Sequence, residues 1–178
     1  AAQSLGLVVV PLYPTDNARS AAGILRDCGA RLLLLGDAEH WEALQVADAS
    51  LSQQLQRVLC AGSPGHGEAH GALLQALDDW LQQPAPAALP VAAQADSLTT
   101  IVYTSGTTGR PMGAMLSHHN ILADAGAVLQ VVKAYREDVF LSFLPLSHAL
   151  ERTVGYYLPM MAGSTVAFAR SAQHLPQD

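Results

Sequence analysis

The sequence carries little charge, and lysine is almost absent from it. Charged residues make up 13% of the 178 residues, and Lys133 is the only lysine beside eight arginines. The net charge is −6, and the basic residues form no cluster along the chain. A nucleic-acid-binding surface needs a basic patch, because it must neutralise phosphates. We therefore expect no nucleic-acid partner.

Long apolar runs and cysteines are also scarce. Half of the residues are hydrophobic, but no apolar run reaches the roughly 18 residues that suggest a membrane span. Cys28 and Cys60 lack the spacing of a metal site, so we expect buried, reduced thiols and a cytoplasmic protein, with a disulfide left open. The first residues, AAQSLG, contain neither an initiating methionine nor the features of a signal peptide. These features predict a soluble globular piece of a longer protein.

The most distinctive stretch runs from Thr99 to His118. An apolar run leads into six small or hydroxylated residues, Thr104 to Gly109, and apolar residues resume at 113–116. This order predicts a strand, a tight polar loop and a second strand. Glycines let a backbone approach a ligand, and backbone N–H groups in such a loop can surround an anion. Because the stretch lacks the Gly-Lys-Ser/Thr of a P-loop, it is either an ordinary turn or a different phosphate-binding loop.

A second polar loop follows a strand that we expect over residues 138–143. Its sequence is Leu144-Pro145-Leu146-Ser147-His148. Loops at the C-terminal ends of strands can meet over one crevice, which is where ligands bind in open α/β sheets. A single histidine is often structural, but this position makes His148 a candidate for the active site. Glu151 and Arg152 follow it and could simply pair with neighbours.

The N-terminal half alternates apolar runs with helical patterns. We expect a helix end before Gly6, a helix over 18–28 and a helix capped by Asp37 and continued over 51–55. Buried strands are expected over residues 7–12, 31–35 and 57–60. This β-α-β rhythm predicts an α/β fold with a largely parallel sheet flanked by helices.

Further helices are expected in the second half of the chain. Leucines at three- and four-residue spacings predict an amphipathic helix over 73–81, and the Pro/Ala-rich residues 82–95 read as a connector within one domain. Ser117 is a suitable N-cap for a helix over 119–132. We expect a helix over 153–161 and a strand over 165–168, and both should belong to the core.

Four other histidines have open roles. His66 and His70 are four residues apart, which on a helix could chelate a metal. Their Pro- and Gly-rich surroundings oppose a helix and no third ligand is evident, so a solvated loop is the alternative. His118 and His119 flank the cap at Ser117 and are either exposed cap residues or ligand contacts.

Two strings of this sequence resemble a known enzyme superfamily. YTSGTTGRPMGAMLSHHN and, some thirty residues later, FLPLSHALER are similar to the phosphate-binding loop and the aromatic/histidine motif of the adenylate-forming synthetases. The likeness is greatest to long-chain fatty acyl-CoA synthetases, and LGLVVVPLYPT and ILRDCGARLLLL extend it towards the N-terminus. These enzymes use ATP and Mg²⁺ to convert a fatty acid into an acyl-adenylate and pass the acyl group to CoA.

The resemblance implies specific site residues. It assigns nucleotide phosphate binding to the loop and its flanks, namely Thr104, Ser105, Gly106, Thr107, Thr108, Gly109 and Arg110. It places His148 between nucleotide and acyl tunnel, where it would orient the carboxylate rather than act as a nucleophile. Tyr156 and Met160 become candidates for lining an acyl path. No residue is assigned to a protein-bound metal.

The sequence departs from the family in two respects. Met112 stands where the family usually has a lysine, and methionine offers neither charge nor donor to a phosphate. Arg110 could partly replace it. The family's adenine-binding string, its ribose-binding aspartate and its C-terminal catalytic domain have no counterpart before Asp178. Residues 1–178 therefore resemble a partial N-terminal AMP-binding domain, and we expect this chain alone not to form acyl-CoA.

Two further functions stay open. The chain could belong to an adenylate-forming ligase for another carboxylic acid, or to one that delivers its product to a carrier protein. A non-catalytic nucleotide- or phosphate-binding module is the alternative from a different class, and Met112 favours it. For a full-length ligase, the resemblance also leaves open a peripheral association with membranes.

Overall fold

A computed structural model defines the positions of most of the chain. The described residues are 2–13, 15–62, 73–84, 93–105 and 111–170. The chain divides into two compact units. We call residues 15–88 the sheet unit, and residues 1–14 with 89–178 the hairpin unit. The boundary at residues 88 and 89 falls inside residues 82–95, whose expected role as a connector within one domain stays a prediction.

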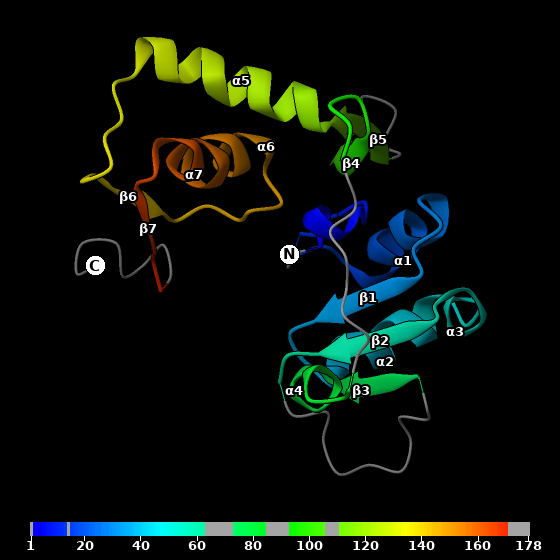
Figure 1. The fold of residues 1–178 in the computed structure, drawn as a ribbon. Coiled ribbons are helices and arrows are strands. Elements are labelled where there is room, and N and C mark those ends of the chain that lie inside the picture. The colour runs from blue at the N-terminus through cyan, green and yellow to red at the C-terminus, as the bar shows by residue number, and fades with distance from the viewer. Residues whose placement is uncertain (1, 14, 63–72, 85–92, 106–110, 171–178) are drawn as a thin grey trace. The chain divides into compact units, whose positions relative to one another are not determined.

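The sheet unit is a three-stranded parallel sheet with helices (Figure 1). The strand order is β1-β2-β3, and Leu33 pairs with Val58, which in turn pairs with Leu74. The expected parallel α/β architecture is thereby confirmed. The elements are α1 (Ala18–Asp27), β1 (Leu32–Leu35), α2 (Ala38–Ala47), α3 (Leu51–Gln54), β2 (Arg57–Cys60), β3 (Leu74–Ala76) and α4 (Leu77–Leu81).

Helix boundaries in the sheet unit follow local side-chain chemistry. The Asn17 side chain accepts a hydrogen bond of 2.9 Å from the Ser20 N–H at the start of α1, and Gly29 follows that helix with a φ of 62°. Cys28 and Cys60 are both free thiols, and burial raises the pKa of Cys28. Cys60 is buried as expected, whereas Cys28 is partly exposed.

Asp37 caps α2 as the sequence predicted. Its carboxylate accepts a hydrogen bond of 3.1 Å from the His40 backbone N–H and lies 2.6 Å from Nδ1 of the His40 ring. The backbone bond from His40, followed by the ring bond, lowers the pKa of Asp37.

We expect Asp37→Ala to destabilise the sheet unit measurably at pH 7, because the cap of α2 is lost. Since the folded-state pKa is depressed, this contribution is present above the ordinary carboxyl pKa and is lost as pH falls through the folded value. Thermal unfolding of both proteins at pH 7 and pH 3 measures it. Asp16→Ala, before the cap of α1, is the matched control, and an unchanged gap at pH 3 would contradict the assignment.

Two predictions in the sheet unit were wrong in detail. The expected helix over 73–81 begins as strand β3, because its first residues add to the edge of β2, and only Leu77–Leu81 is helical. The strand expected to be buried over 31–35 has only Leu33 buried, whereas Leu34 is 59% exposed. Side chains alternate between the two faces of a strand, and one face of β1 is uncovered.

The hairpin unit combines an antiparallel hairpin with a helical layer and a small parallel pair of strands. The hairpin strands are β4 and β5, and β6 pairs in parallel with β7. The elements are η1 (Gln3–Leu5), β4 (Leu98–Ser105), β5 (Pro111–Ser117), α5 (His118–Val131), β6 (Val139–Ser142), α6 (Ala149–Glu151), η3 (Arg152–Tyr157), α7 (Leu158–Ala162) and β7 (Thr165–Phe168).

Sequence signals at two helix ends of this unit are confirmed. Gly6 ends η1 with a φ of 73°, and Ser117 caps α5. The Ser117 hydroxyl accepts a hydrogen bond of 3.2 Å from the Asn120 N–H, while the Asn120 side chain accepts one of 2.9 Å from the Ser117 N–H. This reciprocal pair fixes where β5 turns into the helix.

The strand expected over residues 7–12 does not form. Only a single parallel bridge joins Val9 to Thr100 of β4, and Leu7 and Val8 are 47% and 40% exposed. The Val9 N–H donates a hydrogen bond of 3.0 Å to the Thr99 carbonyl, and the Ile101 N–H donates one of 3.2 Å to the Val9 carbonyl. Pro11 cannot donate to a ladder, which is consistent with the pairing stopping there.

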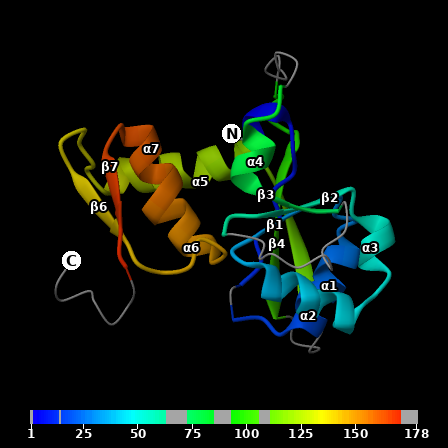
Figure 2. The ribbon, with the colours of Figure 1, turned by 90° about the horizontal axis from the view of Figure 1, so that it is seen from below.

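Residues 149–162 form one helical column with a change of winding in its middle, which Figure 2 shows as α6 running into α7. Six residues, Arg152–Tyr157, adopt a π-helix before Pro159, whose missing N–H cannot support regular α-helical bonding. Among the described residues, none of the helices has the length and apolar composition for crossing a membrane.

Candidate functional site

The predicted phosphate-binding loop connects the two strands of the hairpin. Thr104 pairs with Met112, and Ser105, the last residue of β4, pairs with Pro111, the first residue of β5. Residues 106–110, which hold the other five predicted contacts (Gly106, Thr107, Thr108, Gly109 and Arg110), lie outside the described residues. Antiparallel partners have Cα atoms about 5 Å apart, so the hairpin holds both ends of this connection close together.

The strand residues beside the loop divide into a buried and an exposed set. Tyr103 is 6% exposed, whereas Thr104 is exposed and Met112 is 63% exposed. Gly113 lies opposite Tyr103, and a Cβ there would lie 3.1 Å from the Tyr103 ring and 2.7 Å from Ile101 Cγ2. A glycine at this position therefore lets the Tyr103 ring lie against the backbone of β5.

Arg152 joins three segments of the hairpin unit. Its Nε donates a hydrogen bond of 3.0 Å to the carbonyl of Leu146, and its Nη1 donates one of 2.8 Å to Thr100 Oγ1. The Thr100 hydroxyl donates a hydrogen bond of 2.6 Å to the carbonyl of Val9. The arginine thus connects the loop before His148 to β4 and, through Thr100, to the N-terminal segment.

Arg152 is a buried residue of the hairpin unit. The residue is 8% exposed, and burial lowers its pKa below the usual arginine value, with Tyr157 and Tyr13 opposing that shift. Arginine stays protonated in proteins. A positive charge therefore lies inside the hairpin unit.

His148 immediately precedes α6. Its backbone N–H donates a hydrogen bond of 2.8 Å to the Pro145 carbonyl, and its own carbonyl accepts one of 3.1 Å from the Arg152 backbone N–H. The residue is exposed, whereas the preceding Ser147 is only 5% exposed. The backbone around His148 is thus held by a tight turn, and its imidazole faces solvent in this structure.

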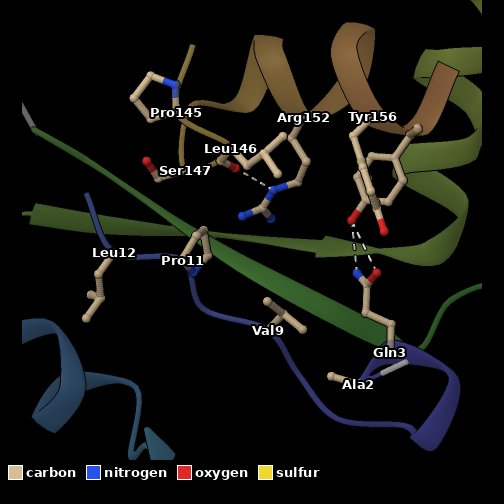
Figure 3. A pocket seen from close by; sticks show the side chains of 11 residues that line it. Ala2, Gln3, Val9, Pro11, Leu12, Pro145, Leu146, Ser147, Arg152 and Tyr156 are labelled. Carbon is tan, nitrogen blue, oxygen red and sulfur yellow. Dashed lines mark hydrogen bonds between the residues drawn. The ribbon is translucent and has the colours of Figure 1, made fainter. Parts of the chain in front are cut away.

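A cavity of about 490 Å³ lies beside Arg152 within the hairpin unit (Figure 3). Its volume lies within the usual range for small-molecule pockets. Tyr156 lines this cavity, whereas His148 and Met160 are not among its lining residues and Met160 is 61% exposed. The lining residues are Ala2, Gln3, Val9, Pro11, Leu12, Pro145, Leu146, Ser147, Arg152, Tyr156 and Tyr157.

One polar contact and one unpaired hydroxyl mark the cavity wall. Gln3 Nε2 donates 3.0 Å to the hydroxyl of Tyr157, which closes one side. Ser147 Oγ is buried and has no hydrogen-bond partner among the described residues. Figure 3 shows Ser147 and the Arg152 guanidinium on the side of the cavity formed by the helix and the loop before it.

Glu151 and Arg152 do not form an ion pair with each other, although both are buried. One oxygen of the Glu151 carboxylate has no partner among the described residues. A Cβ on Gly155 would lie 2.8 Å from Glu151 Cδ, so the glycine leaves room for this side chain. Arg152 hydrogen-bonds to neutral neighbours, whereas neither residue is in an ion pair among the described residues.

The remaining histidine candidates have mixed outcomes. The N–H groups of His118 and His119 donate to the carbonyls of Ser97 and Ala95, at 3.2 and 2.7 Å. Both residues therefore contribute backbone bonds at the start of α5, while a ligand role for their rings stays a prediction. His66 and His70 lie outside the described residues.

Sequence reasoning missed the importance of Arg152 and Ser147. The sequence contained one signal for this role. The charged pair Glu151-Arg152 directly precedes an apolar helical segment, where exposed residues are not expected. Thr100, one partner of the Arg152 guanidinium, lies 52 residues away in the sequence, so no local pattern indicates this contact.

The chain was compared with known proteins. The whole chain, residues 1–178, matches the family described as AMP-binding enzyme. A human long-chain-fatty-acid–CoA ligase 6 is 33% identical over 171 residues, which cover 86% of this chain and 24% of that protein. Long chain acyl-CoA synthetase 4 of Arabidopsis thaliana is 29% identical over 84% of this chain and 24% of its own length.

Solved structures share the fold. An anthranilate CoA ligase, AuaEII, solved with anthranoyl-AMP, superposes with a TM-score of 0.81 and 22% identity, covering 98% of this chain and 33% of that one. The chain spans about a quarter of the length of the curated relatives it matches. The comparisons therefore describe one part of a larger fold.

Proposed function

The chain belongs to the AMP-binding enzyme family, and from this premise we propose that it is part of an ATP-dependent fatty acid–CoA ligase. Such an enzyme activates a fatty acid with ATP to an acyl-adenylate and transfers the acyl group to CoA. Relatives that carry long-chain fatty acid–CoA ligase names support the choice of substrate.

The hairpin is the observation that carries this proposal. Strands β4 and β5 hold both ends of a hydroxyl- and glycine-rich connection. We assign binding of the ATP phosphates to Thr104, Ser105 and residues 106–110, including the cation Arg110. Attack of a carboxylate on a phosphate needs positioned donors, because the two reacting groups repel each other. Backbone N–H groups and hydroxyls in this connection would supply them.

Magnesium fits the proposal as a companion of ATP. The described residues contain no group of three or more His, Cys, Asp or Glu side chains that could hold a metal ion. Magnesium commonly binds through substrate phosphates with few protein ligands. When bound, it would neutralise phosphate charge, while the loop residues hold the nucleotide in place.

His148 and Tyr156 are assigned to the acyl side of the proposed site. The tight turn at Pro145 and the bond from Arg152 hold the backbone of His148, so its ring can orient a carboxylate without forming a covalent bond. Tyr156 lines the cavity and is proposed to contact the acyl chain. Met160, which lies outside the cavity wall, is the weaker of the two acyl-path assignments.

Calorimetric titration of the 178-residue chain with MgATP tests the phosphate assignment. We expect saturable binding without acyl-CoA production when palmitate and CoA are added. The double variant Thr107→Ala/Thr108→Ala should weaken binding at least tenfold, since two hydroxyl donors to a charged group are lost. Thr165→Ala, an exposed threonine of β7, is the control. Equal affinity of the double variant would contradict the assignment.

A non-catalytic nucleotide-binding module is the second candidate, favoured by an exposed methionine at position 112 beside the loop. ATP–pyrophosphate exchange by the full-length protein separates the two. Exchange that depends on a fatty acid supports the ligase, exchange with another acid supports a relative of different specificity, and MgATP binding without exchange supports the module.

A further inference from the structure

The side chain of Arg152 bonds two segments that the proposed reaction has to bring together. One is the loop of residues 144–148, which we call the His148 loop, where the guanidinium Nε reaches the Leu146 carbonyl. Figure 3 shows this bond, with the guanidinium extending from the helix. The other is β4, where Nη1 reaches Thr100 Oγ1. Since β4 leads directly into the predicted phosphate-binding loop, one side chain joins the strand that carries that loop to the His148 loop.

Arg152 holds the His148 loop at two points. Besides the side-chain bond to Leu146, the backbone N–H of Arg152 donates to the carbonyl of His148, whose own N–H closes a turn onto Pro145. Ser147, between the two bonded residues, is buried, whereas His148 is exposed. The backbone of this loop, rather than packing of the imidazole, therefore sets where the ring of His148 is placed.

The β4 end of this connection is fixed as well. Thr100 is completely buried, and its hydroxyl proton is donated to the Val9 carbonyl. A hydroxyl has one proton, so Thr100 Oγ1 can only accept from Arg152. The direction of both bonds is thereby determined, and the guanidinium has a rigid acceptor on the strand.

A buried charge at this position is not explained by stability alone. Among the described residues Arg152 forms no ion pair, and its side chain interacts with the neutral groups of Leu146, Thr100 and Tyr157. Burying a charge is costly, and an apolar side chain of similar size is often at least as stabilising. A planar guanidinium presents its N–H donors in fixed directions. Arginine can therefore fix the distance between loop and strand, which an apolar side chain cannot do.

We propose that Arg152 is a positioning residue for formation of the acyl-adenylate: it holds the His148 loop in register with β4, so that the carboxylate oriented by His148 meets the nucleotide held at the end of that strand. This inference rests on the proposed ligase function. Thr100 lies five residues before Ser105, or roughly 16 Å along the strand, so the Arg152–Thr100 bond acts on geometry rather than on the phosphates.

The expected kinetic signature follows from this geometry. A misplacement of about 1 Å caused by a change far from the reacting atoms can lower a rate about 100-fold. The residues assigned to the phosphates are untouched when the Arg152–Thr100 bond is removed. Turnover should therefore fall, while the affinity for MgATP should barely change.

ATP–pyrophosphate exchange with palmitate, catalysed by the full-length protein, tests the inference through Thr100. Thr100→Val keeps the side-chain shape and removes the hydroxyl, so kcat should fall at least tenfold and the KM for MgATP should change less than twofold. Thr100→Ser keeps the hydroxyl but loses a buried methyl group, and should retain kcat within about twofold. Thr99→Val is the matched control, because Thr99 is 1% exposed and its Oγ1 has no partner among the described residues.

Two further measurements separate positioning from folding. Arg152→Met should lower kcat at least as much as Thr100→Val, and Thr100→Val keeps the test valid if Arg152→Met does not fold, as judged by thermal unfolding. Hydrogen exchange of the peptide of residues 144–152, followed by mass spectrometry, should be at least fivefold faster in Thr100→Val than in the wild type and unchanged in Thr99→Val. This peptide has the same sequence in all three proteins, so its exchange can be compared directly.

The outcomes distinguish the positioning role from the proposed function. If the wild type catalyses exchange, an unchanged kcat in Thr100→Val, or a rise in the KM for MgATP without a fall in kcat, would overturn the positioning role and leave the ligase proposal intact. Equal losses in Thr100→Ser and Thr100→Val would also overturn it, because packing and not the bond would be responsible. Absence of exchange in the wild type with every carboxylic acid tried would refute the ligase proposal, and the positioning role with it.

Discussion

Replacing Trp41 by alanine is expected to lower the free energy of unfolding of the sheet unit by about 3–5 kcal/mol. Trp41 is 1% exposed on α2, which packs against α1 and β1. Truncation removes a large apolar side chain and leaves a cavity that the surrounding elements fill only in part. A small domain has only about 5–15 kcal/mol of stability in total, so a loss of this size is severe.

Thermal and urea unfolding followed by tryptophan fluorescence and circular dichroism measure the loss. In a domain of this size, it corresponds to a fall in the melting midpoint of more than about 10 °C. Trp80→Ala is the matched control, because Trp80 in α4 is only half-buried, and we expect a clearly smaller effect. Similar losses in the two variants would show that Trp41 does not anchor the core of the sheet unit.

Replacing Met112 by lysine is expected to tighten MgATP binding by at least tenfold, or about 1.4 kcal/mol. Met112 is 63% exposed and pairs with Thr104, directly beside the predicted phosphate-binding loop. A lysine would place an ammonium group near the phosphates, whereas methionine offers no donor or charge. The substitution changes an exposed side chain, so stability should barely change.

The control for Met112→Lys is Met115→Lys on the same strand. Met115 is 66% exposed and lies three residues, roughly 10 Å, further from the loop. At physiological salt the Debye length is about 8 Å, so charge at this distance should have little effect on ATP. In the full-length protein, Met112→Lys should also raise the rate of ATP–pyrophosphate exchange. Equal tightening by both lysines would indicate a general charge effect, and no change in exchange would remove the assigned role of position 112.

Local chemistry explains why several elements could be predicted from the sequence. Asp37 and Ser117 cap helices through bonds to residues three positions away, and Gly6 ends a helix because it tolerates a left-handed backbone. Each of these bonds joins neighbours in the sequence. The strand–loop–strand pattern around residues 104–109 was predicted for the same reason, since turn residues lie between two apolar runs.

The predictions that failed depended on partners far along the chain. Residues 7–12 have a strand-like composition, but only Val9 finds a neighbour, so a single bridge forms. Residues 74–76 have the spacing of a helix, but β2 offers them an open edge and they pair with it. Hydrophobic periodicity reports local preference, whereas strand pairing is decided by which edge is free.

The sequence by itself determined the family, the helix caps and the position of the candidate phosphate loop between two strands, because short-range spacing and motif order carry that information. Only the tertiary structure decided the environment of Arg152, which donates to Leu146 and to Thr100 of β4, while Thr100 in turn donates to Val9 of the N-terminal segment. Burial of a charge depends on how these segments pack, and no local pattern encodes it. The cationic cavity follows from packing, and the loop follows from the sequence.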